Sequence, residues 1–241
     1  MGAAITSIMS FRFKQFFIED SQCAMKVGTD GVLLGCWAPT SHLASDIGHR
    51  RILDVGTGSG LIALMLQQRC PDAHIDAIDI DPAAVAQARA NGANASLSRL
   101  QEWKPGVRYG LVVSNPPYFK NSLKNPDKGR ELARHTDTLS YEELVAHASR
   151  LMAEEGVFAL ILPAEAEEEI MALAAKYNLT PTRITRVYSK ESKPARRIMM
   201  AFSRRAGISE YRHTETDSLV LENETGGRSA AYQELCKEFY L

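Results

Sequence analysis

Residues 51–60 read Arg51-Ile52-Leu53-Asp54-Val55-Gly56-Thr57-Gly58-Ser59-Gly60, an apolar run that leads directly into a loop with three glycines. The run is typical of a short buried strand, and the apolar segment 61–69 behind the loop is typical of a helix that stops before Pro71. Glycine lets a loop adopt positive φ and lets its backbone approach a ligand closely. The stretch therefore predicts a strand, a ligand-binding loop and a helix.

Segments outside this stretch alternate between strand-like and helix-like patterns, which is typical of an α/β fold with a parallel sheet. We predict strands at 51–55, 74–79, 111–114, 157–162, 182–187 and 197–202, with an additional strand in the tail at 218–222. We predict helices over 61–69, 82–95, 141–152, 165–177 and 230–239. The chain then divides into an N-terminal arm at 1–50, a core at 51–205, and a tail with a strand and a helix at 206–241.

The composition is that of a single domain without a strong overall charge. The chain has 241 residues, 45% of them hydrophobic, and its formal net charge is −1, so any basic surface for nucleic acid has to be local. The four cysteines, at 23, 36, 70 and 236, lack a C-x-x-C pair, which argues against a zinc site and favours a reducing cytoplasm. No segment is long and apolar enough to cross a bilayer. We therefore expect a cytoplasmic protein with no metal and no membrane partner.

The glycine-rich loop has two acidic companions that bear on its ligand. Asp79 ends the second predicted strand, where a carboxylate that only accepts hydrogen bonds suits the hydroxyls of a ribose. The spacing Gly58-x-Gly60-x-x-Ala63 also fits a dinucleotide fingerprint, so an NAD enzyme competes at this point. Asp54 would oppose a bound pyrophosphate but attract the cationic amine of a methionyl group. The charge favours S-adenosylmethionine, with these binding residues: Asp54, Gly56, Gly58, Gly60 and Asp79.

A second motif, Asn115-Pro116-Pro117-Tyr118, follows the predicted strand at 111–114 and so lies at the carboxyl edge of the sheet, where open α/β folds bind ligands. The prolines stiffen this corner. The side-chain oxygen of Asn115 and the carbonyl of Pro116 could accept both hydrogens of an exocyclic amine and orient its lone pair toward a methyl donor. Tyr118 could stack on a base taken out of its own stack. The motif predicts methyl transfer to an amino nitrogen, with Asn115, Pro116 and Tyr118 at the catalytic site.

Taken together, the segments 54–60 and 115–118, with Asp79 between them, resemble the class I amino-methyltransferases, which carry an N-P-P-[YF] motif. The resemblance covers residues 51–202 and implies a Rossmann-like fold, in which a mostly parallel seven-stranded sheet has helices on both faces. It also implies S-adenosylmethionine as cofactor. It does not select the substrate, because the motif serves adenine in DNA, adenine in RNA and glutamine in proteins.

The flanking segments resemble one family in particular, the bacterial methyltransferases that act on adenine N6 in valine tRNA. The resemblance lies in the motif F-K-Q-F-F at 13–17, in the segment 23–38 and in the ending F-Y-L at 239–241. It implies a tRNA substrate and methylation of adenine 37, next to the anticodon. It also implies that Lys26, Thr29 and Asp30 lie on a loop that closes over the cofactor. Thr29 could instead cap a helix that begins at Asp30.

Two features depart from that family. Gly110 stands where the family usually has an aspartate before the strand that leads into its N-P-P-Y motif. The segment 91–109 is about ten residues too short for a helix end, a full strand and its loop at ordinary lengths. No acidic residue is evident there for the adenine ring of the cofactor, so we assign no residue to that contact.

Two basic stretches flank the expected substrate end of the sheet and could neutralise phosphates of a tRNA stem. The first, at 120–134, contains Lys120, Lys124, Lys128, Arg130 and Arg134. The second, at 183–212, contains nine basic residues and is opposed within the stretch only by Glu191 and Glu210. An ordinary solvated surface would also account for charge runs of this kind.

Three alternatives to a tRNA adenine methyltransferase stay open. A methylase of a glutamine amide in a translation factor shares the N-P-P-Y chemistry, but it predicts a peptide groove and little sensitivity to salt. A DNA adenine methylase normally needs a target-recognition segment larger than this chain offers. A protein that binds the cofactor without catalysis would keep its function when Asn115 is replaced.

Overall fold

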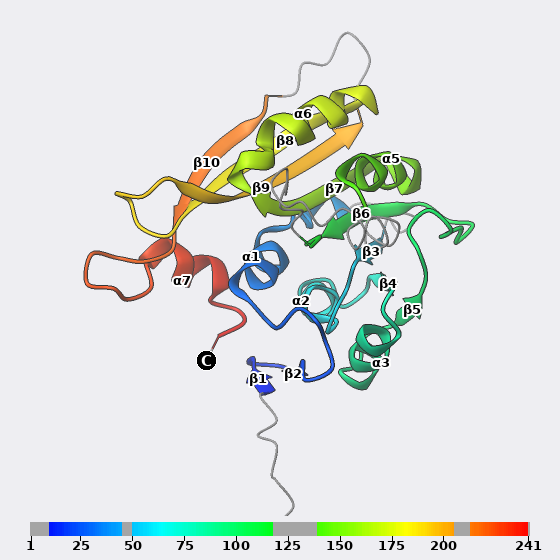
Figure 1. Cartoon of the computed structure of the whole chain (residues 1–241), viewed down its shortest axis with the longest axis horizontal. Coiled ribbons are helices and arrows are strands. Elements are labelled where there is room, and N and C mark those ends of the chain that lie inside the picture. The colour runs from blue at the N-terminus through cyan, green and yellow to red at the C-terminus, as the bar shows by residue number, and fades with distance from the viewer. Residues whose placement is uncertain (1–9, 45–49, 118–138, 205–212, 241) are drawn as a thin grey trace, which may run out of the picture.

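The computed structural model describes residues 10–44, 50–117, 139–204 and 213–240, and one eight-stranded sheet runs through most of them (Figure 1). Its strands are β3 (Arg51–Val55), β4 (His74–Asp79), β5 (Ala95–Leu97), β6 (Tyr109–Ser114), β7 (Met152–Pro163), β8 (Leu179–Tyr188), β9 (Ala195–Arg204) and β10 (Glu215–Val220). Their order across the sheet is β10-β8-β9-β7-β6-β3-β4-β5. Strand β9 is antiparallel to β7 and β8, and all other neighbours are parallel.

The mostly parallel arrangement predicted from the sequence is confirmed, but the sheet has eight strands where seven were expected. The additional strand is β5 (Ala95–Leu97), which was not predicted. The tail strand β10 pairs in parallel with β8 from Glu215↔Arg183 to Val220↔Tyr188. The tail strand was predicted at 218–222, without a place in the sheet. By pairing with β8 it supplies partners for backbone groups that an uncovered edge strand would leave unpaired. The division of the chain at residues 50 and 205 stays a prediction.

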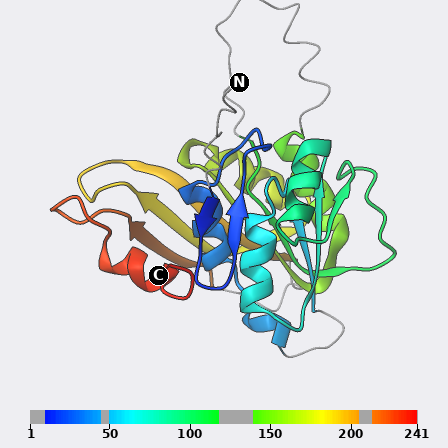
Figure 2. The ribbon, with the colours of Figure 1, turned by 90° about the horizontal axis from the view of Figure 1, so that it is seen from below.

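Helices cover both faces of the sheet, as predicted (Figure 1 and Figure 2). They are α1 (Thr29–Trp37), α2 (Leu61–Arg69), α3 (Pro82–Ala90), α5 (Tyr141–Leu151), α6 (Glu167–Lys176) and α7 (Ala230–Cys236), with short 3₁₀ turns at Ser41–Ala44 and Ala164–Ala166. Strand residues such as Ile52 and Leu111 pack with α1, α2, α3 and α7, whereas their neighbours Leu53 and Val112 pack with α5 and α6. This alternation follows from the two-residue period of a strand. Among the described residues, no helix is long and apolar enough to span a membrane.

The end of α3 differs from the prediction because the backbone turns there. The helix stops at Ala90 and not at residue 95, since Asn91 is its C-cap and Gly92 takes a φ of +100°. Ala95 then begins β5, a strand of three residues that was not predicted. The short segment 91–109 therefore contains a minimal strand and a long loop.

Helix α5 begins at its predicted position, whereas β7 and β6 begin earlier than predicted. A capping box of Ser140 and Glu143 stabilises the start of α5 at Tyr141, where the sequence predicts it. Strand β7 begins already at Met152, immediately after the helix, and is twelve residues long. Strand β6 begins at Tyr109, so Gly110 lies inside the strand and not before it.

The N-terminal arm contains a hairpin of β1 (Ser10–Arg12) and β2 (Phe17–Glu19), which packs against the tail. The Lys14 N–H donates to the Phe239 carbonyl at 2.9 Å, and the rings of Phe13 and Tyr240 stack with centroids 5.8 Å apart. Helix α7 also meets α1, where the Sγ atoms of Cys36 and Cys236 lie 3.5 Å apart. The two ends of the described chain therefore stabilise each other and contribute to the hydrophobic core.

Candidate active site

A cavity of about 760 Å³ lies at the carboxyl ends of β3, β4 and β6. Its walls are the segments 55–59, 78–81 and 114–117, which follow these strands, together with 98–101 and part of the N-terminal strap, our name for residues 20–28 between β2 and α1. Its volume lies within the range of about 300–1,000 Å³ typical of small-molecule sites. Among the described residues, no group of three or more His, Cys, Asp or Glu side chains could hold a metal ion.

The register of the sheet brings the two sequence motifs together. Val55 pairs with Ile78 on one side and with Ser114 on the other. The Ser114 hydroxyl also donates to the Val55 carbonyl at 2.9 Å. The glycine-rich loop, Asp79 and Asn115 are the next residues on the three strands, so they leave the sheet at the same level and share one cavity.

Asp79 lines the cavity and also organises the loops around it. Its Oδ2 atom accepts the Gly58 N–H at 2.9 Å, and its Oδ1 atom accepts the Asp81 N–H at 3.0 Å. Gly58 has a φ of +55° and Gly56 a φ of +72°, a region that favours glycine. Each carboxylate oxygen has two lone pairs, so Asp79 keeps acceptor capacity for ribose hydroxyls. The donor and acceptor chemistry of this wall fits the nucleoside part of S-adenosylmethionine.

Asp54 does not line the cavity in this structure, and neither does Gly60. The Asp54 side chain is fully buried beneath the loop, where its Oδ2 atom accepts the Thr57 hydroxyl at 2.6 Å and the Ala63 N–H at 3.2 Å. Ala63 is in the first turn of α2, where backbone N–H groups have no partner within the helix. The N-cap residue, Gly60, has no side chain that could accept the Ala63 N–H. Asp54 therefore caps α2 and stabilises the loop from below. Its contact with a cationic amine stays a prediction.

Burial raises the pKa of Asp54 to about 7, although the hydrogen bonds from Thr57 and Ala63 act to lower it. In an unfolded chain an aspartate has a pKa of about 3.9. The folded chain therefore binds this proton more tightly, and its free energy of unfolding should fall as the pH rises from about 4 to about 7. The Asp54→Asn variant should lack this contribution.

The measurement is urea unfolding of the native protein and of Asp54→Asn at several pH values between 4 and 7. We expect the stability of the native protein, relative to the variant, to fall by at most about 1.4 kcal/mol per pH unit. Because other titrating groups are common to both proteins, their contributions cancel in the difference. Parallel profiles would contradict the raised pKa.

The three residues assigned to the cofactor cover have different environments. Lys26 and Asp30 line the cavity, whereas Thr29 does not. The Lys26 Nζ atom donates to two backbone carbonyls of the strap, at 2.7 and 3.1 Å. The Asp30 carboxylate accepts the Arg197 Nε–H at 2.9 Å, which ties α1 to β9. Helix α1 begins at Thr29 with Gly28 as its N-cap and no side-chain cap, so the alternative in which Thr29 caps the helix is wrong.

The N-P-P corner forms the wall opposite Asp79. Asn115, Pro116 and Pro117 line the cavity, and Tyr118 lies outside the described residues. The Asn115 Nδ2 atom lies 4.0 Å from the Sδ atom of Met25, which is a residue of the strap. The strap and the N-P-P corner therefore meet at Asn115.

The segment after β5 supplies a wall to which the sequence assigned no residue. Residues 98–101 line the cavity beyond Asp79. The Gln101 Nε2 atom donates to Glu143 Oε1 at 3.1 Å, and the Arg150 Nη2 atom donates to the Leu100 carbonyl at 3.3 Å. This loop is therefore held by α5, the helix that carries Glu143 and Arg150. A three-residue strand is too short to show a period, so no local pattern marks this wall.

Four of the nine basic residues in the second basic stretch form ion pairs with acidic residues from other parts of the chain. Its ion pairs are Arg183–Asp217 at 2.9 Å, Lys190–Glu222 at 3.7 Å, Arg197–Asp30 at 2.9 Å and Arg186–Glu167. Acidic residues outside the stretch therefore oppose it in addition to Glu191 and Glu210. Lys193 in the β8–β9 turn and Arg196 at the start of β9 are exposed, and the segments 120–134 and 205–212 lie outside the described residues. A contact of these stretches with tRNA stays a prediction.

Known proteins resemble this chain in sequence and in fold. The family model for the methyltransferase small domain matches residues 35–178. A tRNA1(Val) (adenine(37)-N6)-methyltransferase of Parabacteroides distasonis is 43% identical over 241 residues, covering 96% of this chain and 97% of the relative. One of Pectobacterium carotovorum is 40% identical over 243 residues, covering 96% and 93%. Among solved structures, a predicted O-methyltransferase from Agrobacterium tumefaciens is similar with a TM-score of 0.62 and 17% identity, covering 87% and 96%, which supports the fold alone.

Proposed function

We propose that this chain transfers a methyl group from S-adenosylmethionine to N6 of adenine 37 in tRNA1(Val). The chain belongs to the methyltransferase small domain family and to the family of its tRNA1(Val) (adenine(37)-N6)-methyltransferase relatives. The observation that supports the proposal most directly is the shared cavity. The glycine-rich loop and the Asn115 corner border it from adjacent parallel strands. An NAD enzyme, which competed on the glycine spacing alone, is set aside because these relatives are methyltransferases.

The proposed cofactor site uses the side of the cavity near β3 and β4. S-adenosylmethionine supplies, when it is bound, a methyl group on a cationic sulfur atom. Asp79 would accept hydrogen bonds from the ribose hydroxyls, and the backbone of Gly56 and Gly58 would lie against the cofactor without side chains in between. Lys26 and Asp30 would cover it from the strap and α1.

The proposed acceptor site uses the N-P-P corner. The exocyclic amine of adenine is a weak nucleophile because its lone pair is delocalised into the ring. The Asn115 side-chain oxygen and the Pro116 carbonyl would accept the two amine hydrogens and turn the lone pair toward the methyl carbon. As the new nitrogen–carbon bond forms, the bond between the methyl carbon and sulfur would break, and its electron pair would stay on sulfur as a neutral thioether. The surplus proton would then pass from N6 to water, so no strong general base is required. Positioning of this kind lowers the activation free energy by several kcal/mol, and by up to about 7–11 kcal/mol in the best cases.

The test is transfer of a labelled methyl group from S-adenosylmethionine into an unmodified transcript of tRNA1(Val). The matched control is the same transcript with guanine at position 37. We expect N6-methyladenosine in nuclease digests of the first transcript and no label in the second. Label in both transcripts would contradict the position. Absence of label in RNA, together with label in glutamine residues of an added cell extract, would support the protein methylase alternative instead.

A further inference from the structure

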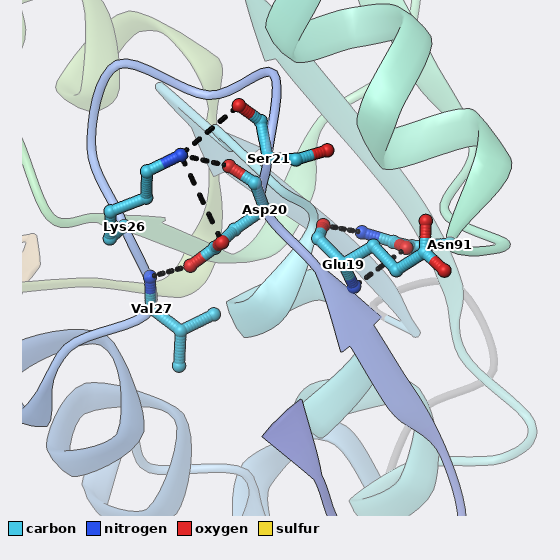
Figure 3. A network of polar contacts seen from close by, with 6 residues as sticks. All are labelled: Glu19, Asp20, Ser21, Lys26, Val27 and Asn91. Atoms are coloured by element: carbon cyan, nitrogen blue, oxygen red, sulfur yellow. Dashed lines mark hydrogen bonds and ion pairs between the residues drawn. The ribbon is translucent and has the colours of Figure 1, made fainter. Parts of the chain in front are cut away.

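The Asn91 side chain bonds both to Glu19, the residue directly before the strap, and to the glycine-rich loop, and Figure 3 shows its bonds to Glu19. The Asn91 Nδ2 atom donates to the Glu19 carbonyl at 2.7 Å, and its Oδ1 atom accepts the Glu19 N–H at 3.1 Å. The side-chain amide thus forms with Glu19, the last residue of β2, the same two backbone hydrogen bonds that a residue of a neighbouring strand would form. The same Nδ2 atom donates to the Ser59 carbonyl at 2.9 Å. One side chain therefore holds two segments that are far apart in the sequence.

The strap that begins after Glu19 is closed on itself by Asp20. The Asp20 side chain is 2% exposed, and its Oδ2 atom accepts the Val27 N–H at 2.7 Å. The Lys26 Nζ atom donates to the Asp20 carbonyl at 2.7 Å, and Figure 3 shows these bonds drawing both ends of the strap together. The strap starts directly after Glu19 and is closed on itself, so the bonds between Asn91 and Glu19 anchor its first residue.

Both ends of this hydrogen-bonded chain reach the same cavity. Ser59 lines it from the glycine-rich loop, and residues 23–28 line it from the strap. We propose that Asn91 is a positioning residue for S-adenosylmethionine, because it holds the strap against the glycine-rich loop and so assembles both walls before the cofactor arrives. The proposal rests on the proposed function for the identity of the ligand. A site that is already assembled does not spend binding free energy on ordering its loops.

Asn94 provides a matched control in the same segment. Its Nδ2 atom donates to the Ile75 carbonyl at 3.3 Å and to Asp76 Oδ1 at 3.1 Å. These partners belong to β4, and Asn94 is not one of the cavity-lining residues. Asn94→Ala therefore removes an asparagine with a similar number of bonds without loosening either wall.

The first measurement is the Kd for S-adenosylmethionine by isothermal titration calorimetry of the full chain, at a temperature where every variant is folded. We expect Asn91→Ala to raise the Kd about tenfold, as for the net loss of one to two hydrogen bonds, and Asn94→Ala to leave it within about twofold. Hydrogen exchange without cofactor should become faster in Asn91→Ala at the amides of both Glu19 and Val27. A role in overall stability alone would change the melting temperature but neither the Kd nor this local pattern.

A second variant tests whether the bonds act as one chain. Asp20→Ala should also raise the Kd, and the double variant should lose less affinity than the product of the two single losses. Losses that multiply would contradict the coupling. Normal binding by the unsubstituted protein with an unchanged Kd in Asn91→Ala would overturn this inference alone. No binding by the unsubstituted protein would overturn the proposed function itself.

Discussion

Replacement of Asn115 by alanine is expected to lower the kcat of methyl transfer by about 10²–10³, the range seen when one oriented hydrogen-bonding group is removed from a reacting centre. The side chain lies on the cavity wall directly after β6, where its oxygen would accept one hydrogen of the target amine. Without it the nitrogen lone pair is no longer oriented. The cofactor side of the cavity does not include Asn115, so the Kd for S-adenosylmethionine should stay within about twofold.

Single-turnover rates with saturating tRNA and cofactor measure this effect, and calorimetry measures the Kd. Asn94→Ala is again the matched control, because it removes an exposed asparagine outside the cavity. A kcat within about threefold of the native value in Asn115→Ala would remove this residue from the proposed catalytic site. It would also revive the alternative of a protein that binds the cofactor without catalysis.

The segment from β3 to the start of α3 could be predicted residue by residue because its signals are local. The glycines 56, 58 and 60 end a strand and open a helix, and Pro71 follows soon after that helix ends. Pro82 opens α3, with Asp81 accepting the Ala83 N–H as a cap at 2.9 Å. Each of these residues acts on its own neighbours. A sequence pattern contains that information directly.

The burial of Asp54 could have been predicted from the sequence, but the prediction considered only its charge and not the geometry of the strand. Side chains alternate between the two faces of a strand, so Asp54 shares a face with Ile52. Ile52 packs in the core cluster that contains Leu61 and Ala63 of α2. The carboxylate consequently points beneath the helix that it caps, away from the cavity.

The contacts of Asn91 and of the basic stretch could not be predicted from local patterns. Asn91 bonds to Glu19, which is 72 positions earlier, and this pairing exists only after β2 and α3 have been brought together. The acidic partners of Arg183 and Arg186 likewise come from β10 and α6. Counting charges within a stretch omits such partners, because opposite charges in a fold need be neighbours only in space.

Replacement of Asp79 by asparagine is expected to raise the Kd for S-adenosylmethionine about 10- to 100-fold, since a hydrogen bond to a charged group contributes about 1.5–3 kcal/mol and each tenfold corresponds to about 1.4 kcal/mol. The carboxylate accepts the N–H groups of Gly58 and Asp81 on its two oxygens. An asparagine amide has one oxygen, so its NH₂ group must face one of these N–H donors. The variant therefore loses acceptor capacity for the ribose and also loosens the loop.

Calorimetry of the folded variant tests this, with Asp72→Asn as the matched control. Asp72 is largely exposed and lies 3.8 Å from Arg50 Nη1, so its replacement removes the same charge outside the cavity. The Kd of Asp72→Asn for S-adenosylmethionine should stay within about twofold of the native value.

At saturating cofactor Asp79→Asn should recover most of the native kcat, because Asn115 and Pro116 are unchanged. A recovered kcat would distinguish Asp79, which is proposed to bind the cofactor, from Asn115, which is proposed to bind the acceptor amine. An unchanged Kd would mean that the ribose does not lie against Asp79, whereas equal losses in both variants would indicate a general effect of charge.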